Sequence, residues 1–96
     1  MNKPGNEPTA TPAENQLNPT QTLDVKGLNC PLPILKTKLA LRRLQAEDLL
    51  QVLATDPHSV VDFKAYCAET GHELIHSVEH GPVFEFFIRV GAKPNF

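Results

Sequence analysis

The sequence predicts an α+β domain, a two-layer sandwich in which two helices cover one face of a four-stranded mixed sheet in the order βαβαββ. Two observations carry this prediction. Apolar residues alternate with polar ones along short segments, which is typical of half-buried strands, and they recur every three or four residues along two longer segments, which is typical of helices. Glycine and proline turn signals separate the segments, and the sequence contains no internal repeat.

The chain has 96 residues, enough for one small domain. Residues 1–20 contain four of the nine prolines and almost no large apolar side chain, so we expect a disordered tail there and a folded domain over residues 21–96. The sequence has no secretory apolar core and no run near the roughly 20 apolar residues of a membrane span. With two cysteines and a net charge of −2, it indicates a protein of the reducing cytoplasm whose main activity is not nucleic-acid binding.

A short strand over residues 22–26 leads into the segment Cys30-Pro31-Leu32-Pro33. We expect Cys30 near the N-cap of the first helix and both prolines in its first turn, where backbone N–H groups have no intrahelical partner. The N–H groups that remain should point back toward the sulfur and, with the helix dipole, favour a thiolate. The segment therefore predicts one accessible, nucleophilic thiol. The alternative is a small buried hydrophobic residue at a helix start.

Residues 31–45 are predicted to form this first helix, with a core-facing stripe made of Ile34, Thr37, Leu41 and Leu44. Leu35 and Leu39 lie on a different side of the helix from this core-facing stripe. They either meet the second helix or form an exposed patch for a partner, and the sequence alone leaves both alternatives open.

Between residues 36 and 43 the same helix carries no acid and four basic residues, Lys36, Lys38, Arg42 and Arg43. One interpretation is an electropositive surround that favours an anionic sulfur and steers an acidic partner. The other is a set of solvated positions on an ordinary helix. Helical spacing places Lys38 and Arg42 together on one flank and the other two on another flank.

An apolar strand over residues 49–55 ends at Asp56-Pro57, which we interpret as a turn without chemistry. Ser59 and Asp62 resemble a capping box that opens a second helix, and Gly71 is placed to end that helix after residue 70. Its core-facing residues are expected to be Val60, Phe63, Cys67 and Thr70. Cys67 is thus interpreted as a core residue, in preference to a resolving partner for Cys30 or a metal ligand.

Residues 73–80 and 83–90 are predicted to form an antiparallel hairpin around a Gly-Pro turn. In the first strand the residues expected to share a side are Leu74, His76, Val78 and His80. In the second strand we expect Phe84, Phe86, Ile88 and Val90 to point inward and Glu85 and Arg89 outward. The run from His72 to His76 spells the H-E-x-x-H zinc motif, but that motif requires a helix and this run has the alternation of a strand, so we expect no metal site.

Several of these residues together match a known pattern. The sequence resembles the TusA/SirA family of small sulfur-carrier proteins over about residues 21–90. The matching residues are Thr22-Leu23-Asp24, Gly27-Leu28, the Cys-Pro-x-Pro motif at 30–33, the basic helix, Asp56-Pro57, Tyr66-Cys67 and Gly71-His72-Glu73-Leu74. The motif is a weak signal alone, but it is specific in combination with the element order and the Asp-Pro position.

The resemblance implies a βαβαββ fold and a persulfide-forming Cys30, with Pro31 and Pro33 as supporting residues. It implies a cysteine desulfurase or rhodanese-type sulfur donor and a downstream relay protein, in tRNA thiolation, sulfur oxidation or thiosulfate use. Such a carrier has sulfurtransferase-type chemistry without being a stand-alone turnover enzyme. It uses no cofactor and forms no stable complex with nucleic acid or membrane. The alternative is a non-catalytic regulatory or interaction module with a structural Cys30.

Overall fold

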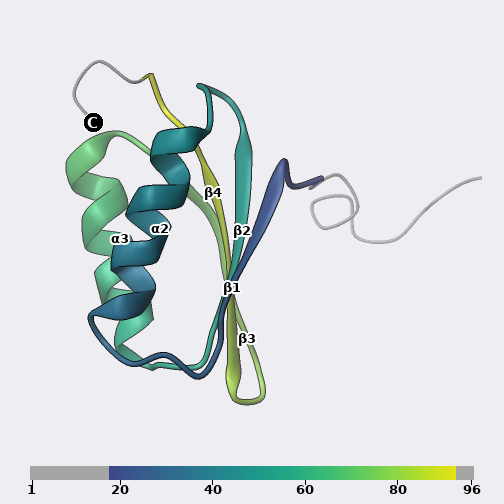
Figure 1. Cartoon of the computed structure of the whole chain (residues 1–96), viewed down its shortest axis with the longest axis vertical. Coiled ribbons are helices and arrows are strands. Elements are labelled where there is room, and N and C mark those ends of the chain that lie inside the picture. The colour runs from purple at the N-terminus through teal and green to yellow at the C-terminus, as the bar shows by residue number, and fades with distance from the viewer. Residues whose placement is uncertain (1–17, 93–96) are drawn as a thin grey trace, which may run out of the picture.

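The computed structural model describes residues 18–92, and Figure 1 shows two helices on one side of a four-stranded sheet. The elements are β1 (Gln21–Val25), α2 (Leu32–Arg43), β2 (Leu49–Ala54), α3 (His58–Thr70), β3 (Glu73–His80) and β4 (Val83–Arg89). The strand order is β1-β2-β4-β3, in which β1 and β2 are parallel and the other two pairs are antiparallel. The predicted two-layer βαβαββ sandwich with a mixed sheet is confirmed.

Most of the predicted tail, residues 1–17, lies outside the described residues. Its last residue, Thr20, already belongs to the fold, because its N–H donates to the Leu49 carbonyl at 2.7 Å and its hydroxyl accepts from the Leu49 N–H at 3.1 Å. Within residues 18–92 no helix is long and apolar enough to cross a membrane.

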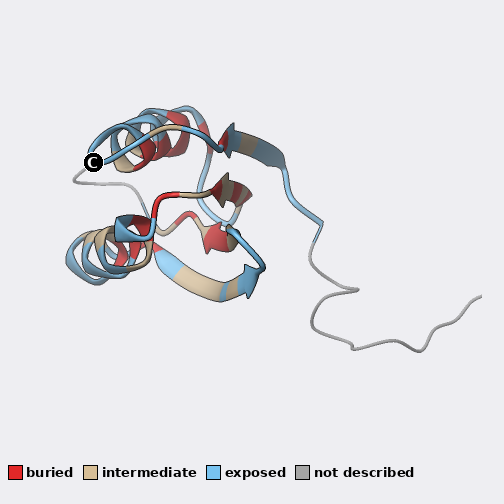
Figure 2. Ribbon diagram, turned by 90° about the horizontal axis from the view of Figure 1, so that it is seen from below, coloured by how far each residue is buried: buried red, intermediate tan, exposed pale blue. Residues whose placement is uncertain are grey.

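The hydrophobic core lies between the helices and the sheet, where Figure 2 shows the buried positions facing one another. Its fully buried apolar side chains include Val25, Leu50, Val52, Phe63, Phe86, Ile88 and Val90. The Phe63 ring of α3 packs against the Phe86 ring of β4 with centroids 4.4 Å apart, which fixes this helix on the sheet. In α2 the predicted stripe is confirmed, since Thr37, Leu41 and Leu44 are buried and Ile34 packs against the core.

Both helices begin slightly differently from the prediction. The N-cap of α2 is Pro31 in place of Cys30, so Pro33 falls at the second helical position. The capping box at Ser59 is wrong: α3 already begins at His58, and the buried Ser59 hydroxyl has no hydrogen-bond partner. Asp56 performs this role from the preceding loop, because its Oδ1 accepts from the His58 N–H at 3.2 Å.

The hairpin forms as predicted, but the shared side proposed for β3 is wrong. The register shifts between Leu74 and His76, which leaves Ile75 as an extra residue. A one-residue bulge moves every following side chain to the opposite face. Leu74 therefore pairs with Ile88 on the helix-covered face, whereas His76 pairs with Phe87 on the open face.

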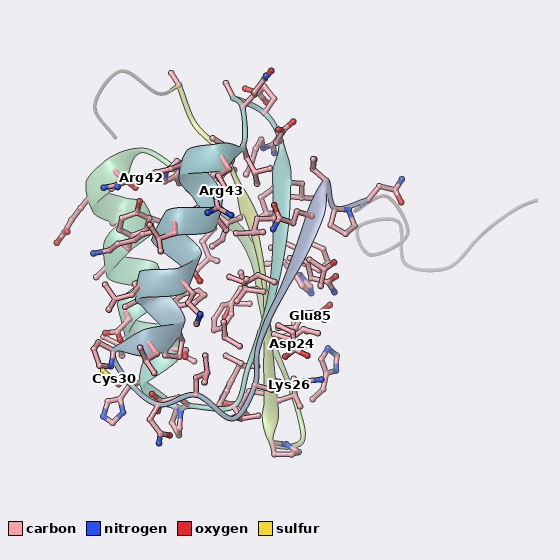
Figure 3. The ribbon with its side chains drawn as sticks, viewed as in Figure 1. Asp24, Lys26, Cys30, Arg42, Arg43 and Glu85 are labelled. Carbon is pink, nitrogen blue, oxygen red and sulfur yellow. The ribbon has the colours of Figure 1, made fainter. Side chains whose placement is uncertain are left out.

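Val78 and His80 lie on the same open face as His76, because they pair with Glu85 and Val83. Figure 3 shows Glu85 on this side of the sheet, away from the helices. The outward direction predicted for Glu85 is thus confirmed, and its carboxylate accepts from Gln51 Nε2 at 2.6 Å.

Candidate functional site

The sulfur of Cys30 lies at the surface, in the loop between β1 and α2. Cys30 is exposed, and Figure 3 shows it at the end of the molecule where α2 begins. The peptide bond between Cys30 and Pro31 is cis. Exposure excludes the alternative in which Cys30 is a small buried hydrophobic residue.

Hydrogen bonds to the loop after β2 hold this segment in place. The N–H of Cys30 donates to Asp56 Oδ2 at 2.5 Å, and the N–H of Gly27 donates to Thr55 Oγ1 at 2.9 Å. Asp56 is buried and also receives the His58 N–H, so a single carboxylate fixes both the cysteine loop and the start of α3. Asp56-Pro57 was interpreted as a turn without chemistry, and the structure adds that Asp56 anchors the cysteine loop.

The surroundings of the sulfur are more acidic than the sequence predicted. Cys30 Sγ donates a hydrogen bond to Asp62 Oδ2 on α3 at 3.8 Å. Partial desolvation, followed by the negative charges of Asp62 and Asp56, raises the pKa of the Cys30 thiol above its ordinary value. The expectation of a lowered pKa is wrong. The expected hydrogen bond from the Leu32 N–H to the sulfur is also missing, because this N–H donates to the Asn29 carbonyl.

Cys30 lies at a groove of about 310 Å³ between α2 and α3. The groove is lined by Cys30, Pro31, Ile34, Lys38, Asp62, Ala65, Tyr66 and Glu69. The wall formed by α2 carries a cation, whereas the wall formed by α3 carries two carboxylates. Lys38 Nζ lies 5.3 Å from the centre of the Tyr66 ring, so a cation–π contact spans the groove.

The four basic residues of α2 divide between two flanks, as their spacing predicted. Lys38 lines the groove beside Cys30, while Lys36 and Arg43 line a second hollow of about 210 Å³ next to β1. Figure 3 shows Arg42 and Arg43 at the opposite end of α2 from Cys30. The predicted electropositive surround of the sulfur is therefore reduced to Lys38.

The open question about the leucines of α2 is settled in favour of exposure. Leu35 and Leu39 are 45% and 54% exposed, and Leu32 beside the cysteine is 44% exposed. These three side chains form an apolar stripe along α2, which we call the leucine stripe. Neither Leu35 nor Leu39 is covered by the second helix.

Cys67 and the histidine motif have structural surroundings. Cys67 is buried on α3 within the core, and burial raises its pKa to about 11, so its interpretation as a core residue is confirmed. His72 is buried just before β3, and its Nδ1 accepts the Gly91 N–H at 3.1 Å. His76 lies within β3 against the Phe87 ring. The zinc motif thus lacks the helix that would bring its histidines together, and no group of metal-ligating side chains occurs in residues 18–92.

Comparisons with known proteins agree with this geometry. The family model described as "Sulfurtransferase TusA" matches residues 21–90. The chain is 51% identical over 69 residues to the sulfur carrier protein TusA of Allochromatium vinosum, covering 72% of this chain and 91% of that protein. It is 41% identical over 74 residues to the protein of the same name from Pseudomonas putida, covering 77% and 92% of the two chains.

A crystal structure of a SirA-like protein from Desulfitobacterium hafniense superimposes with a TM-score of 0.66. The two sequences are 25% identical, and the match covers 74% of this chain and 97% of the other. The family match spans nearly the whole described domain, including the cysteine loop and both helices. The chain therefore belongs to the sulfurtransferase TusA family.

Proposed function

We propose that this protein is a sulfur carrier that accepts sulfane sulfur as a persulfide on Cys30 and passes it to a downstream protein. The observation that carries the proposal is the exposed Cys30 sulfur, held in a fixed loop beside the α2–α3 groove. The names of the relatives support the carrier role, since those from A. vinosum and P. putida are both sulfur carrier proteins. Pro31 supports the site as the N-cap of α2, and the buried Pro33 supports it from the first turn.

The reaction is an exchange between a thiol and a persulfide. The Cys30 sulfur attacks the outer sulfur of a donor persulfide, R–S–SH, and forms a new S–S bond. The bond between the two donor sulfurs breaks, and the donor cysteine leaves with that electron pair and recovers a proton as R–SH. One sulfane sulfur moves from the donor thiol to the Cys30 thiol, so the step needs no oxidant, reductant or cofactor.

The raised pKa of the Cys30 thiol is compatible with this chemistry. Each unit of increase lowers the thiolate fraction at neutral pH about tenfold, but it also raises the intrinsic nucleophilicity of the thiolate about threefold. The net loss of rate is therefore only about threefold per unit. An exposed thiol that is protonated at rest is also less open to oxidation before it meets its donor.

The donor is a cysteine desulfurase or a rhodanese-type protein, and α2 offers the surface on which it docks. The leucine stripe begins at Leu32, close to the sulfur, and the four basic residues Lys36, Lys38, Arg42 and Arg43 lie along the same helix. Such a surface fits a partner whose contact region is apolar with acidic edges. Loading from a protein donor should then slow as salt concentration rises. The relay serves tRNA thiolation, sulfur oxidation or thiosulfate use, in the reducing cytoplasm, where thiols are kept reduced.

Intact mass spectrometry tests the proposal. After incubation with a cysteine desulfurase and cysteine, the protein should gain about 32 Da, the mass of one sulfur atom, and reductant should remove it. The Cys30→Ser variant should gain nothing, whereas Cys67→Ser should load normally. A second arm with thiosulfate in place of the desulfurase distinguishes a protein donor from a small-molecule donor. Full loading of Cys30→Ser would show that another residue accepts the sulfur. A wild-type protein that gains no sulfur would favour the alternative, a regulatory or interaction module in which Cys30 has no chemistry.

A further inference from the structure

The carboxylate of Asp62 reaches the sulfur of Cys30 from the opposite wall of the groove. Asp62 lies in the second turn of α3, and its Oδ2 is 3.8 Å from Sγ, within range of a hydrogen bond to sulfur. Among the described residues, the Cys30 thiol is the group that donates a hydrogen bond to the Asp62 side chain. The carboxylate is therefore committed to the sulfur and not to capping the helix.

The other ionisable groups around the sulfur have different engagements. Asp56 on the preceding loop accepts the Cys30 and His58 N–H groups and contacts the His58 ring at 3.3 Å. Lys38 on α2 lies over the Tyr66 ring of α3. Glu69 lines the same groove, two turns further along α3 than Asp62. Of these groups, only Asp62 makes a hydrogen bond to Sγ.

We propose that Asp62 is a catalytic residue of sulfur loading, which accepts the Sγ proton as Cys30 attacks the outer sulfur of a donor persulfide. This role rests on the proposed function. As the new S–S bond forms, the proton moves from Sγ to Asp62 Oδ2. The donor S–S bond breaks, and its electron pair leaves on the donor cysteine. Asp62 then returns the proton to that thiolate, directly or through water, so the carboxylate is regenerated.

A nucleophile with a base in hydrogen-bond contact is the usual arrangement for activating a group that is protonated at rest. The same carboxylate has a second, opposite effect, because its negative charge disfavours a free thiolate. The two effects can be separated by experiment. Reagents that react with thiolate already present at equilibrium should work faster without the charge, whereas transfer from a persulfide should become slower without the base.

The test compares the wild-type protein with Asp62→Asn in two assays. Loading from a persulfidated cysteine desulfurase, followed by rapid quench and mass spectrometry, should fall about 100-fold at pH 7 in the variant. Its rate should also become proportional to hydroxide concentration and lose its solvent deuterium isotope effect. Alkylation by iodoacetamide should be faster than in wild type.

Two further variants serve as controls. Asp62→Glu should recover part of the loading rate. Glu79→Gln, which removes one exposed carboxylate from β3, should match wild type in both assays.

Two results overturn the role. Loading by Asp62→Asn at the wild-type rate and with the wild-type pH profile would show that the carboxylate takes no proton. A parallel fall of loading and alkylation would show that Asp62 only positions the loop. In both cases wild-type Cys30 still gains sulfur and the proposed function stands, whereas a wild-type protein that gains no sulfur overturns the carrier function itself.

Discussion

The two cysteines of this domain differ in what raises their pKa. Cys67 is buried in the core, where burial alone raises its pKa to about 11. Cys30 is exposed, and its pKa is raised by partial desolvation together with the carboxylates of Asp62 and Asp56. A partner that docks on Cys30 can change its solvation and its neighbouring charges, whereas nothing short of unfolding changes the surroundings of Cys67. Access and adjustable neighbours therefore distinguish the reactive sulfur, more than its resting pKa does.

The structural supports of the two sulfurs differ in the same way. Cys67 lies on the face of α3 that also carries Phe63, whose ring packs against Phe86. That part of the molecule is held by close packing, which responds as a unit. The Cys30 loop is held by individual hydrogen bonds that Cys30 donates to Asp56 and Asp62. Each hydrogen bond can be removed by its own substitution, so the site can be altered while the fold stays intact.

The largest difference that this comparison predicts is in alkylation of the native protein. Iodoacetamide should modify Cys30 at its surface, with a midpoint above the ordinary value of 9.0 in its pH profile. Cys67 should react only when the domain opens, which at a stability of about 5 kcal/mol slows it by about 10³-fold or more. Peptide mass spectrometry after timed labelling measures both rates. Equal labelling of the two cysteines under native conditions would contradict the comparison.

A smaller difference is expected in stability. Cys67→Ser places a hydroxyl in an apolar site and should lower the free energy of unfolding by about 1–3 kcal/mol. Cys30→Ser changes an exposed loop position and should stay within about 0.5 kcal/mol of wild type. Urea denaturation followed by circular dichroism measures both values. If Cys30→Ser were the more destabilising variant, its sulfur would be a structural group after all.

Most of the fold could be predicted because its signals are local. Helical spacing identified the buried Thr37 and Leu41, alternation identified the inward Phe86 and Ile88, and a glycine marked the end of α3. The error in β3 arose because a β-bulge leaves no local signal in the sequence. The bulge at Ile75 follows from pairing with β4, so simple alternation assigned the histidines of this strand to the wrong side.

The site could be predicted only in part, because its main contacts join residues distant in the chain. The proline-rich segment identified Cys30, but Asp56 and Asp62 approach it across 26 and 32 residues of sequence. Asp56 was interpreted as part of a turn and Asp62 as part of a capping box for the second helix, and neither was assigned to the cysteine loop. The available signal was Asp56, an aspartate in the loop after β2, which could have been expected to accept a hydrogen bond from the loop before α2. The two carboxylates that lie beside Cys30 were consequently missing from the predicted site.

The smallest predicted effect is an acid titration confined to the Cys30 side of the comparison. Hydrogen bonds from the His58 and Cys30 N–H groups hold the pKa of Asp56 below its ordinary value of 3.8, although desolvation opposes them. The stabilisation of the Cys30 loop is therefore complete above pH 3.8 and is lost as the pH falls through the lower, folded-state value. In an NMR titration from pH 6 to pH 2, the Cys30 amide proton should shift with a midpoint below 3.8, while the Cys67 amide stays unchanged until the domain unfolds. Asp56→Asn should abolish that shift. A midpoint at or above 3.8, or an equal shift at Cys67, would mean that the loop is not anchored separately from the core.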